Sequence, residues 1–468
     1  MLFSSIAFLY YFLPAVILVY FLLPFRYKNI LLLITSLIFY AWGEPKYSLL
    51  MIFSVIEGFL LGLLIEREQG TKRGRILVIV SVVINLSLLG FFKYFNFFLT
   101  NINGVFKWDF PLLSIALPMG VSFYIFSIIS YTIDIYRGLF KAEKNILDFT
   151  TYITFFPQLV AGPIIRYSDI LIQLHKRSHS LYECYYGGRR FIMGLAKKVL
   201  LANAFGALVS RYQEANEKSV LFYWLYAAAF TLQIYYDFSG YSDMAIGLGR
   251  IFGFRFLENF NYPYISRSIT EFWRRWHMSL SAWFKDYVYI PLGGNRVSIP
   301  KQICNLFIVW ILTGFWHGAS WNFILWGLYF AVILIFEKFC LKKISWKRKG
   351  KILPHVYVMI LVMVSFVLFN GDNMTQAFRE ISGMFGFTNA EFFNIESLYY
   401  LRSYAVVLII GIIGTTPLFK NYYNRLPANK SIENVTMVME PVFLTIILLI
   451  VTGYLVDGSF NPFLYFRF

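Results

Sequence analysis

Apolar runs long enough, or nearly long enough, to cross a lipid bilayer recur along the whole chain. They lie at about residues 5–24, 29–43, 47–65, 76–92, 113–136, 303–316, 321–339, 353–370, 403–419 and 438–456. A helix needs about 20 mostly apolar residues to span the hydrocarbon core, and it satisfies its own backbone hydrogen bonds there. The pattern therefore predicts an all-α integral membrane protein that crosses the bilayer many times.

Basic residues gather in the short connectors between these runs. Residues 26–28, 72–75, 137–144 and 342–351 are assigned to the cytoplasmic side, because lysine and arginine are enriched in cytoplasmic loops. The segment 371–399 holds four acidic residues and a single basic one, so it is expected outside. The N-terminus is then expected outside as well.

Composition agrees with this interpretation, since 58% of the 468 residues are hydrophobic and only 14% are charged. The net charge of +17 arises from the short clusters and forms no continuous basic face, so nucleic acid is not an expected partner. Cys184, Cys304 and Cys340 lack metal-ligand spacing. Neither a metal site nor an essential disulfide is therefore expected.

The middle of the chain, from about 150 to 330, does not alternate simply between apolar and polar segments. Residues 155–169 (FFPQLVAGPIIRYSD) and 233–250 (QIYYDFSGYSDMAIGLGR) place polar groups inside apolar runs. Interrupted helices are tolerated at membrane depth where they line protein or a wet cavity. We therefore expect residues 150–330 to form the catalytic core of a single polytopic domain that covers residues 1–468, since no internal repeat or linker divides the chain.

His317 is the first candidate for catalysis, because it lies between two apolar runs in the sequence GFWHGA. An ionisable residue near the bilayer interior is costly to place and marks a functional site. Burial favours the neutral imidazole, which can accept a proton. Gly314, Gly318 and Ala319 are expected to leave room for a substrate beside the ring. The alternative is a packing histidine bonded to a backbone carbonyl.

His277 is the second candidate, and it lies in residues 269–284 (ITEFWRRWHMSLSAWF). Helical spacing places Trp273, His277, Leu280 and Phe284 on one face, which predicts an interfacial amphipathic helix with Arg274 at the level of lipid phosphates. A histidine on an apolar face is also compatible with a core residue. Spacing does not show whether His277 and His317, 40 residues apart, meet.

Two acidic residues and one glycine loop have less specific interpretations. Asp237 and Asp243 fall on different helical faces, so each is expected to pair with an arginine such as Arg274 rather than to form a carboxylate pair. The loop 291–296 (PLGGNR) offers backbone N–H donors and a cation to a phosphate-bearing donor. A simple turn is the alternative for this loop.

Four blocks of sequence together resemble the membrane-bound O-acyltransferase superfamily, and within it the AlgI branch that acetylates exopolysaccharides. They are FFPQLVAGPIIR at 155–166, QIYYDFSGYSDMAIGLGR at 233–250, NFNYPYISRSITEFWRRWHMSLSAWFKDYVYIPLGGNR at 259–296 and TGFWHGASWNFILWG at 313–327. The related DltB branch, which passes D-alanine to teichoic acids, differs around the first block. The resemblance covers nearly the whole chain.

The resemblance implies a ring of about 11 or more transmembrane and re-entrant helices around a thinned core with a central tunnel. It makes His317 the superfamily's principal catalytic histidine and His277 the second one. A cytoplasmic acyl thioester, acetyl-CoA or a related donor, and an extracellular acceptor would both reach His317. Trp316 and Trp321 would line the tunnel. We group Arg274, Gly293, Gly294 and Arg296 with them as candidate donor-binding residues.

The implied protein is a multi-pass enzyme of a bacterial cell membrane, an O-acyltransferase that needs no metal and no permanently bound cofactor. Its expected partners are membrane lipids, the polysaccharide acceptor and an extracellular SGNH-type acetyltransferase or esterase. Transfer of D-alanine or another acyl group is the alternative within the enzyme class. Outside that class, His317 and the carboxylates could line an ion or lipid pathway in a transporter or scaffold.

The tail 457–468 ends in FNPFLYFRF and is expected outside the membrane. Its pattern resembles the carboxy-terminal motif of DltX, the small membrane partner of DltB, in which a tyrosine is thought to carry the acyl group. By that resemblance Tyr465 would be an acyl carrier, and the 12 residues can extend about 40 Å to reach the active site. An interfacial aromatic anchor, with Arg467 near lipid phosphates, is the alternative.

Overall fold

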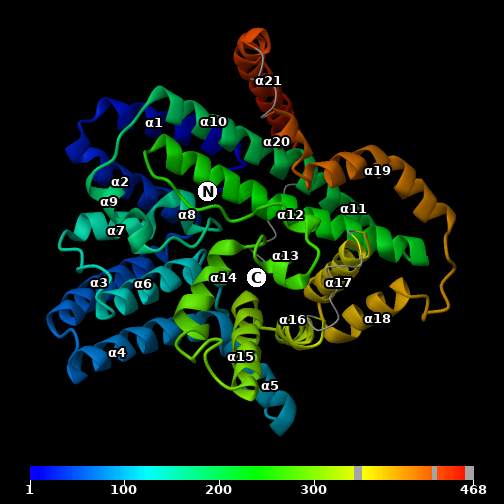
Figure 1. The fold of residues 1–468 in the computed structure, drawn as a ribbon, viewed down its shortest axis with the longest axis horizontal. Coiled ribbons are helices and arrows are strands. Elements are labelled where there is room, and N and C mark those ends of the chain that lie inside the picture. Colours follow the sequence, from blue (N-terminus) through cyan, green and yellow to red (C-terminus); the bar gives the residue numbers. More distant parts are fainter. Residues whose placement is uncertain (342–349, 351, 424–429, 459–468) are drawn as a thin grey trace. The chain divides into compact units, whose positions relative to one another are not determined.

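The computed structural model describes residues 1–341, 350, 352–423 and 430–458 (Figure 1). Within these ranges the regular structure is helical and includes no strand. Eight helical segments of the described part are long and apolar enough to cross a membrane, namely Ser48–Arg67, Lys72–Phe106, Leu181–Glu214, Ile299–His317, Trp321–Phe339, Ile352–Asn370, Ile395–Gly414 and Met437–Val456. The prediction of an all-α polytopic membrane protein is confirmed.

Two further apolar helical segments, Phe8–Leu22 and Val121–Tyr136, are shorter than a full span. The second corrects the expected run 113–136, because residues 108–118 form no helix and α6 begins at Val121. Gly120 precedes it with φ 71°, and a Cβ at this position would overlap the carbonyl oxygen of Leu159. The chain therefore turns in a left-handed conformation that suits glycine, and hydropathy alone does not reveal this turn.

The expected span 403–419 also begins earlier than predicted. α19 covers Ile395–Gly414, because Asn394 caps it: its side chain accepts from the Ser397 N–H, and Ser397 Oγ accepts from the Asn394 N–H. This reciprocal cap satisfies two N-terminal donors. The expected outer segment 371–399 thus holds α18 (Met374–Met384) and the first turn of α19.

The chain divides into two compact units that are each built from separate segments. The first contains Met1–Phe191 and Ser242–Leu257, and the second contains Ile192–Tyr241 and Glu258–Phe468. The long helices α10 (Leu181–Ala196) and α12 (Val220–Ile251) contribute residues to both.

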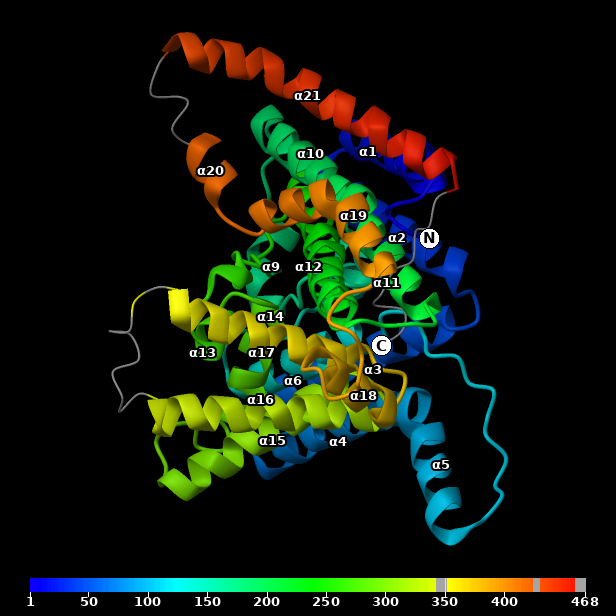
Figure 2. The same cartoon turned by 90° about the vertical axis from the view of Figure 1, so that its right-hand side faces the viewer.

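The first unit is a bundle in which α3, α4 and α6 pack together and α2 packs on α7 (Figures 1 and 2). Its elements are η1 (Phe8–Phe12), α1 (Leu13–Leu22), α2 (Phe25–Gly43), α3 (Ser48–Arg67), α4 (Lys72–Leu89), η2 (Gly90–Tyr94), α5 (Phe95–Phe106), α6 (Val121–Tyr136), α7 (Ile146–Thr154), α8 (Phe156–Leu159) and α9 (Tyr167–His175). Buried phenylalanine rings at positions 3, 8, 39 and 156 contact one another and close one end of its core.

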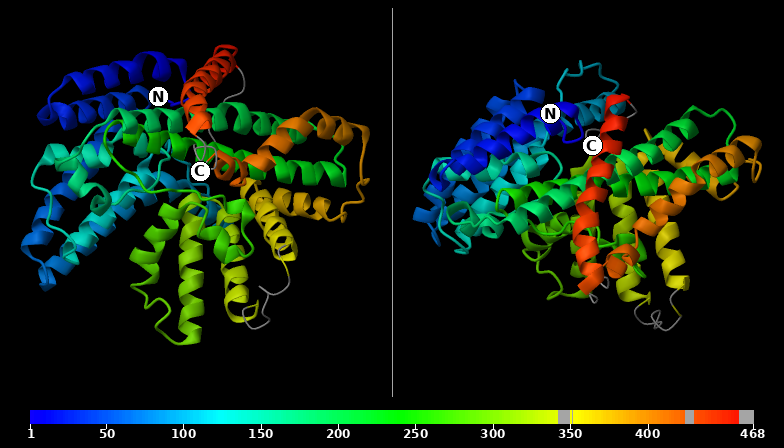
Figure 3. Two further views of the ribbon diagram at one scale, coloured as in Figure 1. Left: turned by 45° about the horizontal axis from the view of Figure 1, so that its top comes forward. Right: turned by 90° about the horizontal axis from the view of Figure 1, so that it is seen from above.

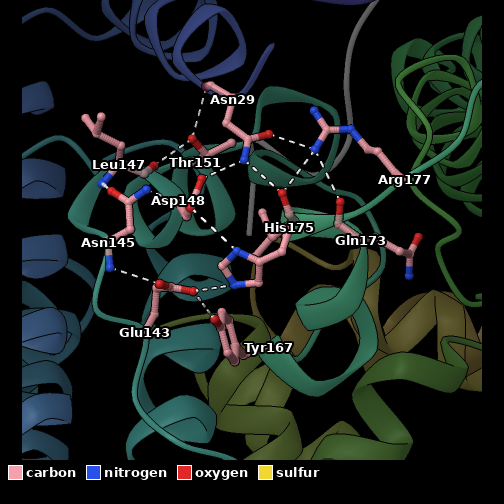
Figure 4. Close-up of polar contacts among 11 residues, drawn as sticks. Asn29, Glu143, Asn145, Leu147, Asp148, Thr151, Tyr167, Gln173, His175 and Arg177 are labelled. Carbon is pink, nitrogen blue, oxygen red and sulfur yellow. Dashed lines mark hydrogen bonds and ion pairs between the residues drawn. The ribbon is translucent and has the colours of Figure 1, made fainter. Parts of the chain in front are cut away.

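A polar cluster ties α2, α7 and α9 of this unit together (Figure 4). Asp148 accepts hydrogen bonds from Asn29 Nδ2 at 2.6 Å and from Asn145 Nδ2 at 2.7 Å. Glu143 accepts from Tyr167 Oη at 2.6 Å and lies 2.9 Å from His175 Nε2. Both carboxylates are buried, and each is held by several donors, as buried charges require.

The second unit holds most of the aromatic core. Its elements are η3 (Lys197–Ala202), α11 (Asn203–Glu214), η4 (Pro263–Ile265), α13 (Ile269–Trp273), α14 (Met278–Phe284), η5 (Lys285–Tyr289), α15 (Ile299–His317), α16 (Trp321–Phe339), α17 (Ile352–Asn370), α18, α19, α20 (Leu418–Tyr423) and α21 (Lys430–Val456). α15 and α16 form a tight helical hairpin with α17 beside α16, and α21, red in Figure 3, contacts η3.

Ion pairs and close glycine contacts join α10 and η3 to α12. In the first unit, Glu183 pairs with Arg250 at 2.7 Å and Arg190 with Asp243 at 2.9 Å. In the second unit, Lys198 Nζ lies 2.6 Å from Asp237 Oδ1. The expectation of an arginine partner is confirmed for Asp243, but Arg274 is wrong as that partner, and Asp237 pairs with a lysine.

The pairing of these helices also depends on glycine. In the first unit a Cβ at Gly187 would lie 2.6 Å from the Gly247 carbonyl oxygen, and in the second unit a Cβ at Gly240 would lie 2.7 Å from the Gly194 carbonyl oxygen. Small residues let membrane helices approach closely. The close approach brings the cations of one helix to the carboxylates of the other.

Candidate active site

His317 is the last residue of α15 and is 7% exposed. Its ring meets three aromatic rings edge-on, with centroid distances of 4.9 Å to Trp316, 5.0 Å to Trp326 and 5.3 Å to Phe369. Trp326 comes from α16 and Phe369 from α17, so three consecutive helices build this environment. The rings exclude water from most of the imidazole.

The glycines beside His317 allow close packing of α15 against α16. A Cβ on Gly314 would overlap the Phe323 carbonyl oxygen, and one on Gly318 would overlap the Phe323 ring. Across the hairpin, a Cβ on Gly327 would overlap the carbonyl oxygen of Trp310. The expectation that Gly314 and Gly318 leave room for a substrate is therefore wrong, because α16 occupies that space. The glycines instead bring α16, and with it Trp326, close to His317.

His277 does not lie within a continuous helix, which corrects the predicted amphipathic helix. α13 ends at Trp273, α14 begins at Met278, and His277 itself has φ 43°. Positive φ is uncommon for a residue other than glycine, and it tends to occur at functional sites. His277 is 1% exposed, and burial lowers its pKa to about 3. Its imidazole is therefore neutral at physiological pH.

Asn259 holds the His277 ring in one orientation. The Asn259 Oδ1 atom lies 3.2 Å from His277 Nδ1 and also accepts hydrogen bonds from the Ser279 N–H at 3.2 Å and Ser279 Oγ at 2.8 Å. Because this oxygen is an acceptor, Nδ1 carries the proton in the neutral ring. His277 Nε2 is then a basic nitrogen, and it is buried without a hydrogen-bond partner among the described residues.

Trp316 connects the two histidines. Its ring centroid lies 6.0 Å from that of His277 and 4.9 Å from that of His317. Phe238 of α12 covers His277 from another side, at 4.6 Å and nearly perpendicular. The structure therefore brings His277 and His317 to one aromatic cluster of the second unit, which sequence spacing left open.

Asn259 and Phe238 were not identified from the sequence. Asn259 precedes a segment without helical or strand periodicity, and its contacts reach residues 18 and 20 positions later. A hydrophobic pattern carries no information on such a contact. The one signal for Asn259 was its position as the first residue of a motif block that resembles the acyltransferase superfamily.

The other predicted site residues lie outside this cluster. Trp321 begins α16 and is 52% exposed, and the Arg274 and Arg296 side chains are exposed. The N–H groups of Gly293 and Gly294 donate to the carbonyl oxygens of Ile290 and Tyr289. These bonds match the alternative of a simple turn, since both donors are used within it. Tyr465 lies outside the described residues.

The side chains of the described residues bear on metal binding and on acid–base chemistry. The described ranges contain no group of three or more His, Cys, Asp or Glu residues placed to hold a metal ion. Cys184, Cys304 and Cys340 are free thiols. The buried imidazoles of His317 and His277 each offer a ring nitrogen that can accept a proton or a hydrogen bond in a dry aromatic environment.

Comparison with known proteins agrees with this chemistry. Residues 34–370 match the model of the membrane-bound O-acyltransferase family. The chain is 43% identical over 392 residues to a probable alginate O-acetylase AlgI of Pseudomonas aeruginosa, covering 83% of this chain and 75% of the relative. It is 37% identical to a probable AlgI of Pseudomonas putida over 100% of both chains. A peptidoglycan O-acetyltransferase of Helicobacter pylori is 33% identical over 98% of this chain and 90% of its own.

Proposed function

Because this chain belongs to the membrane-bound O-acyltransferase family, we propose that it takes an acetyl group from a cytoplasmic thioester and delivers it for O-acetylation of an extracellular polysaccharide. The observation that carries the proposal is the buried His317, which the aromatic rings of three consecutive helices surround within a matched family region. The names of the relatives, alginate and peptidoglycan acetylating proteins, support acetyl as the group and a polysaccharide as the final acceptor.

In the proposed reaction, neutral His317 removes the proton from an acceptor hydroxyl as its oxygen attacks the thioester carbonyl carbon. The C–S bond then breaks, the departing thiolate takes the proton that His317 had accepted, and the acetyl group is left as an ester on the acceptor oxygen. General-base catalysis of this kind is most efficient when the pKa of the base lies near the operating pH. Trp316 and Trp326, both buried beside His317, would limit hydrolysis of the donor by excluding water.

His277 is proposed to assist from the other side of Trp316. Its Nε2 atom, oriented by Asn259, can accept a hydrogen bond from the acceptor or from a bound water. The donor is proposed to be acetyl-CoA or a related thioester. The exposed guanidinium groups of Arg274 and Arg296 are candidate contacts for its phosphates. An extracellular SGNH-type protein is proposed to complete transfer to the polymer.

A sealed-vesicle assay tests the proposal. Purified protein is reconstituted into liposomes that contain acetyl-CoA labelled in its acetyl group, and a polyuronate is added outside with the SGNH partner. We expect ester-linked label on the external polymer only in vesicles that contain the protein. Label that stays inside as acetate or acetyl-CoA would contradict the transfer function. Transfer of D-alanine from a loaded carrier, without acetyl transfer, would favour the alternative acyl group.

Tyr465 is proposed as an intermediate acceptor of the acetyl group. A phenol, with an ordinary pKa of about 10, is easier to deprotonate than a serine hydroxyl and is a better leaving group for onward transfer. We expect Tyr465→Phe to abolish polymer acetylation while membrane insertion and thermal stability stay unchanged. Mass spectrometry of the C-terminal peptide should find an added acetyl group on the active protein and none on the variant. Normal acetylation by Tyr465→Phe would leave the tail as an anchor only.

A further inference from the structure

The second unit contains a polar cavity of about 540 Å³. None of the residues that line it is His277 or His317. Its walls are formed by the end of α11, the loop 215–219, α18 and the loop 388–394. The lining side chains include Tyr212, Lys218, Tyr223, Arg379, Glu380 and Asn394. A second hollow of about 560 Å³ shares Lys218 and is lined by Gln213, Asp372 and Gln376. The volume is within the range of small-ligand sites.

Backbone and side-chain hydrogen bonds fix the walls of this cavity. The N–H groups of Val220 and Leu221 donate to the carbonyl oxygens of Glu391 and Phe392, each at 2.9 Å. Trp224 Nε1 donates to the Met384 carbonyl oxygen at 2.7 Å. The two loops are therefore joined, and the cavity between them is preformed rather than dependent on a ligand for its shape.

Polar groups inside the cavity lack the partners that buried groups normally have. The Tyr212 side chain is fully buried and stacks on Tyr226 at 4.2 Å, yet its hydroxyl has no hydrogen-bond partner within the described part of the chain. Buried hydroxyl groups in proteins are usually hydrogen-bonded. Tyr212 lines the cavity, so a ligand bound there can supply the missing partner.

The two cations of the cavity interact electrostatically with Glu380 but form no close ion pair with it. Lys218 Nζ lies 4.3 Å above the Tyr212 ring, and neither Lys218 nor Arg379 forms an ion pair among the residues that the structure describes. Glu380 is 4% exposed and accepts a hydrogen bond from Gln376 at 3.2 Å. Burial lowers the pKa of Lys218 and raises the pKa of Glu380.

The cavity is on the side of the membrane where an acceptor is expected. Its loop 388–394 and α18 belong to segment 371–399, which holds four acidic residues and Arg379 as its single basic residue, unlike the basic clusters typical of cytoplasmic loops. The loop 215–219 is hydrogen-bonded to the same segment, because Asn394 Nδ2 donates to the Glu217 carbonyl oxygen at 3.5 Å. Both loops are therefore expected to face the polysaccharide.

We propose that this cavity binds a carboxylated sugar of the acceptor polysaccharide, with Lys218 and Arg379 pairing with the sugar carboxylate and Tyr212 hydrogen-bonding a sugar hydroxyl. The inference rests on the proposed function for the identity of the acceptor. Arginine and lysine recognise carboxylates through charge-assisted hydrogen bonds. The site would hold the polymer near the membrane, and its lining includes neither His277 nor His317.

The test measures binding of a fluorescent oligouronate to the full-length protein in lipid nanodiscs. We expect Lys218→Gln and Arg379→Gln each to weaken binding about 10-fold, which corresponds to about 1.4 kcal/mol, and Lys218→Arg to retain most of it. Lys107→Asn, at an exposed residue of another expected outer loop, is the matched control and should bind like the parent. A neutral oligoglucan of the same length should bind weakly to every form. Thermal midpoints identify any variant that fails to fold.

The outcomes separate this site from the acetyl-transfer activity. Oligouronate binding by Lys218→Gln and Arg379→Gln at the parent affinity would overturn the site, even if the parent acetylates polymer in vesicles. Binding that depends on both cations would support the site even if no form transfers acetyl. If both variants keep oligouronate binding but lose capture of the SGNH protein, the cavity is a protein-docking site and the sugar proposal is wrong.

Discussion

Alanine in place of His317 is expected to reduce polymer acetylation by about 10²- to 10⁴-fold, the range that a general base contributes to a proton-transfer step. The side chain contacts aromatic rings of α15, α16 and α17, and its loss removes the proposed base without removing a charge from the core. The rate is measured in the sealed-vesicle assay at saturating donor and acceptor. Size-exclusion elution and thermal midpoint check that the variant is folded.

His355→Ala is the matched control for that substitution. His355 lies in α17 of the same unit, is partly buried, and its Nδ1 atom lies 3.3 Å from the Ser266 carbonyl oxygen. We expect its acetylation rate to stay within about threefold of the parent, since it has no place in the aromatic cluster. His277→Ala should fall between the two. Parent-like acetylation by His317→Ala would require abandoning the enzyme assignment for a scaffold or transporter.

The second large effect concerns stability, at the buried pair of Lys198 and Asp237. Their side chains are 3% and 2% exposed, and their charged atoms lie 2.6 Å apart. Replacing one partner, as in Lys198→Met or Asp237→Leu, is expected to cost about 3–5 kcal/mol, because an uncompensated charge stays buried. The measurement is the free energy of unfolding in lipid or detergent, determined by reversible steric trapping.

The double variant distinguishes a lost charge pair from lost packing. Lys198→Met combined with Asp237→Leu should recover much of the stability, because no unpaired charge then remains. Arg211→Met, which breaks the exposed Arg211–Glu214 pair, should cost at most about 1 kcal/mol. Additive losses in the double variant would contradict a pair-based explanation.

The membrane spans could be predicted from the sequence because hydropathy depends on local composition. Runs such as 321–339 and 353–370 coincide with α16 and α17 within a residue or two. The failures have identifiable causes: a left-handed glycine delays α6, and a side-chain cap advances α19. Both causes act through backbone conformation, to which hydropathy is insensitive.

The sequence identified the histidines and glycines of the candidate site. It did not predict their backbone conformation or the residues that they contact. His277 has helical spacing to Trp273 and Leu280, yet the chain breaks there because Asn259, distant in sequence, bonds both His277 and Ser279. Gly314 and Gly318 have the small side chains expected beside a substrate, but the facing helix α16 uses that space. In both cases a tertiary contact overrides the local pattern.

The ion pairs that join α10 and η3 to α12 bear on how these helices are inserted into the membrane during translation. Arg190 and Lys198 lie in the span Leu181–Glu214, and a lone charge at membrane depth costs about 2.5–3.5 kcal/mol during insertion. Their partners, Asp243 and Asp237, are synthesised later. A nascent chain that stops before Asp237 holds both cations without counter-charges. We therefore expect the two helices to insert as one unit, with the first helix settling in the membrane only after the second has been made.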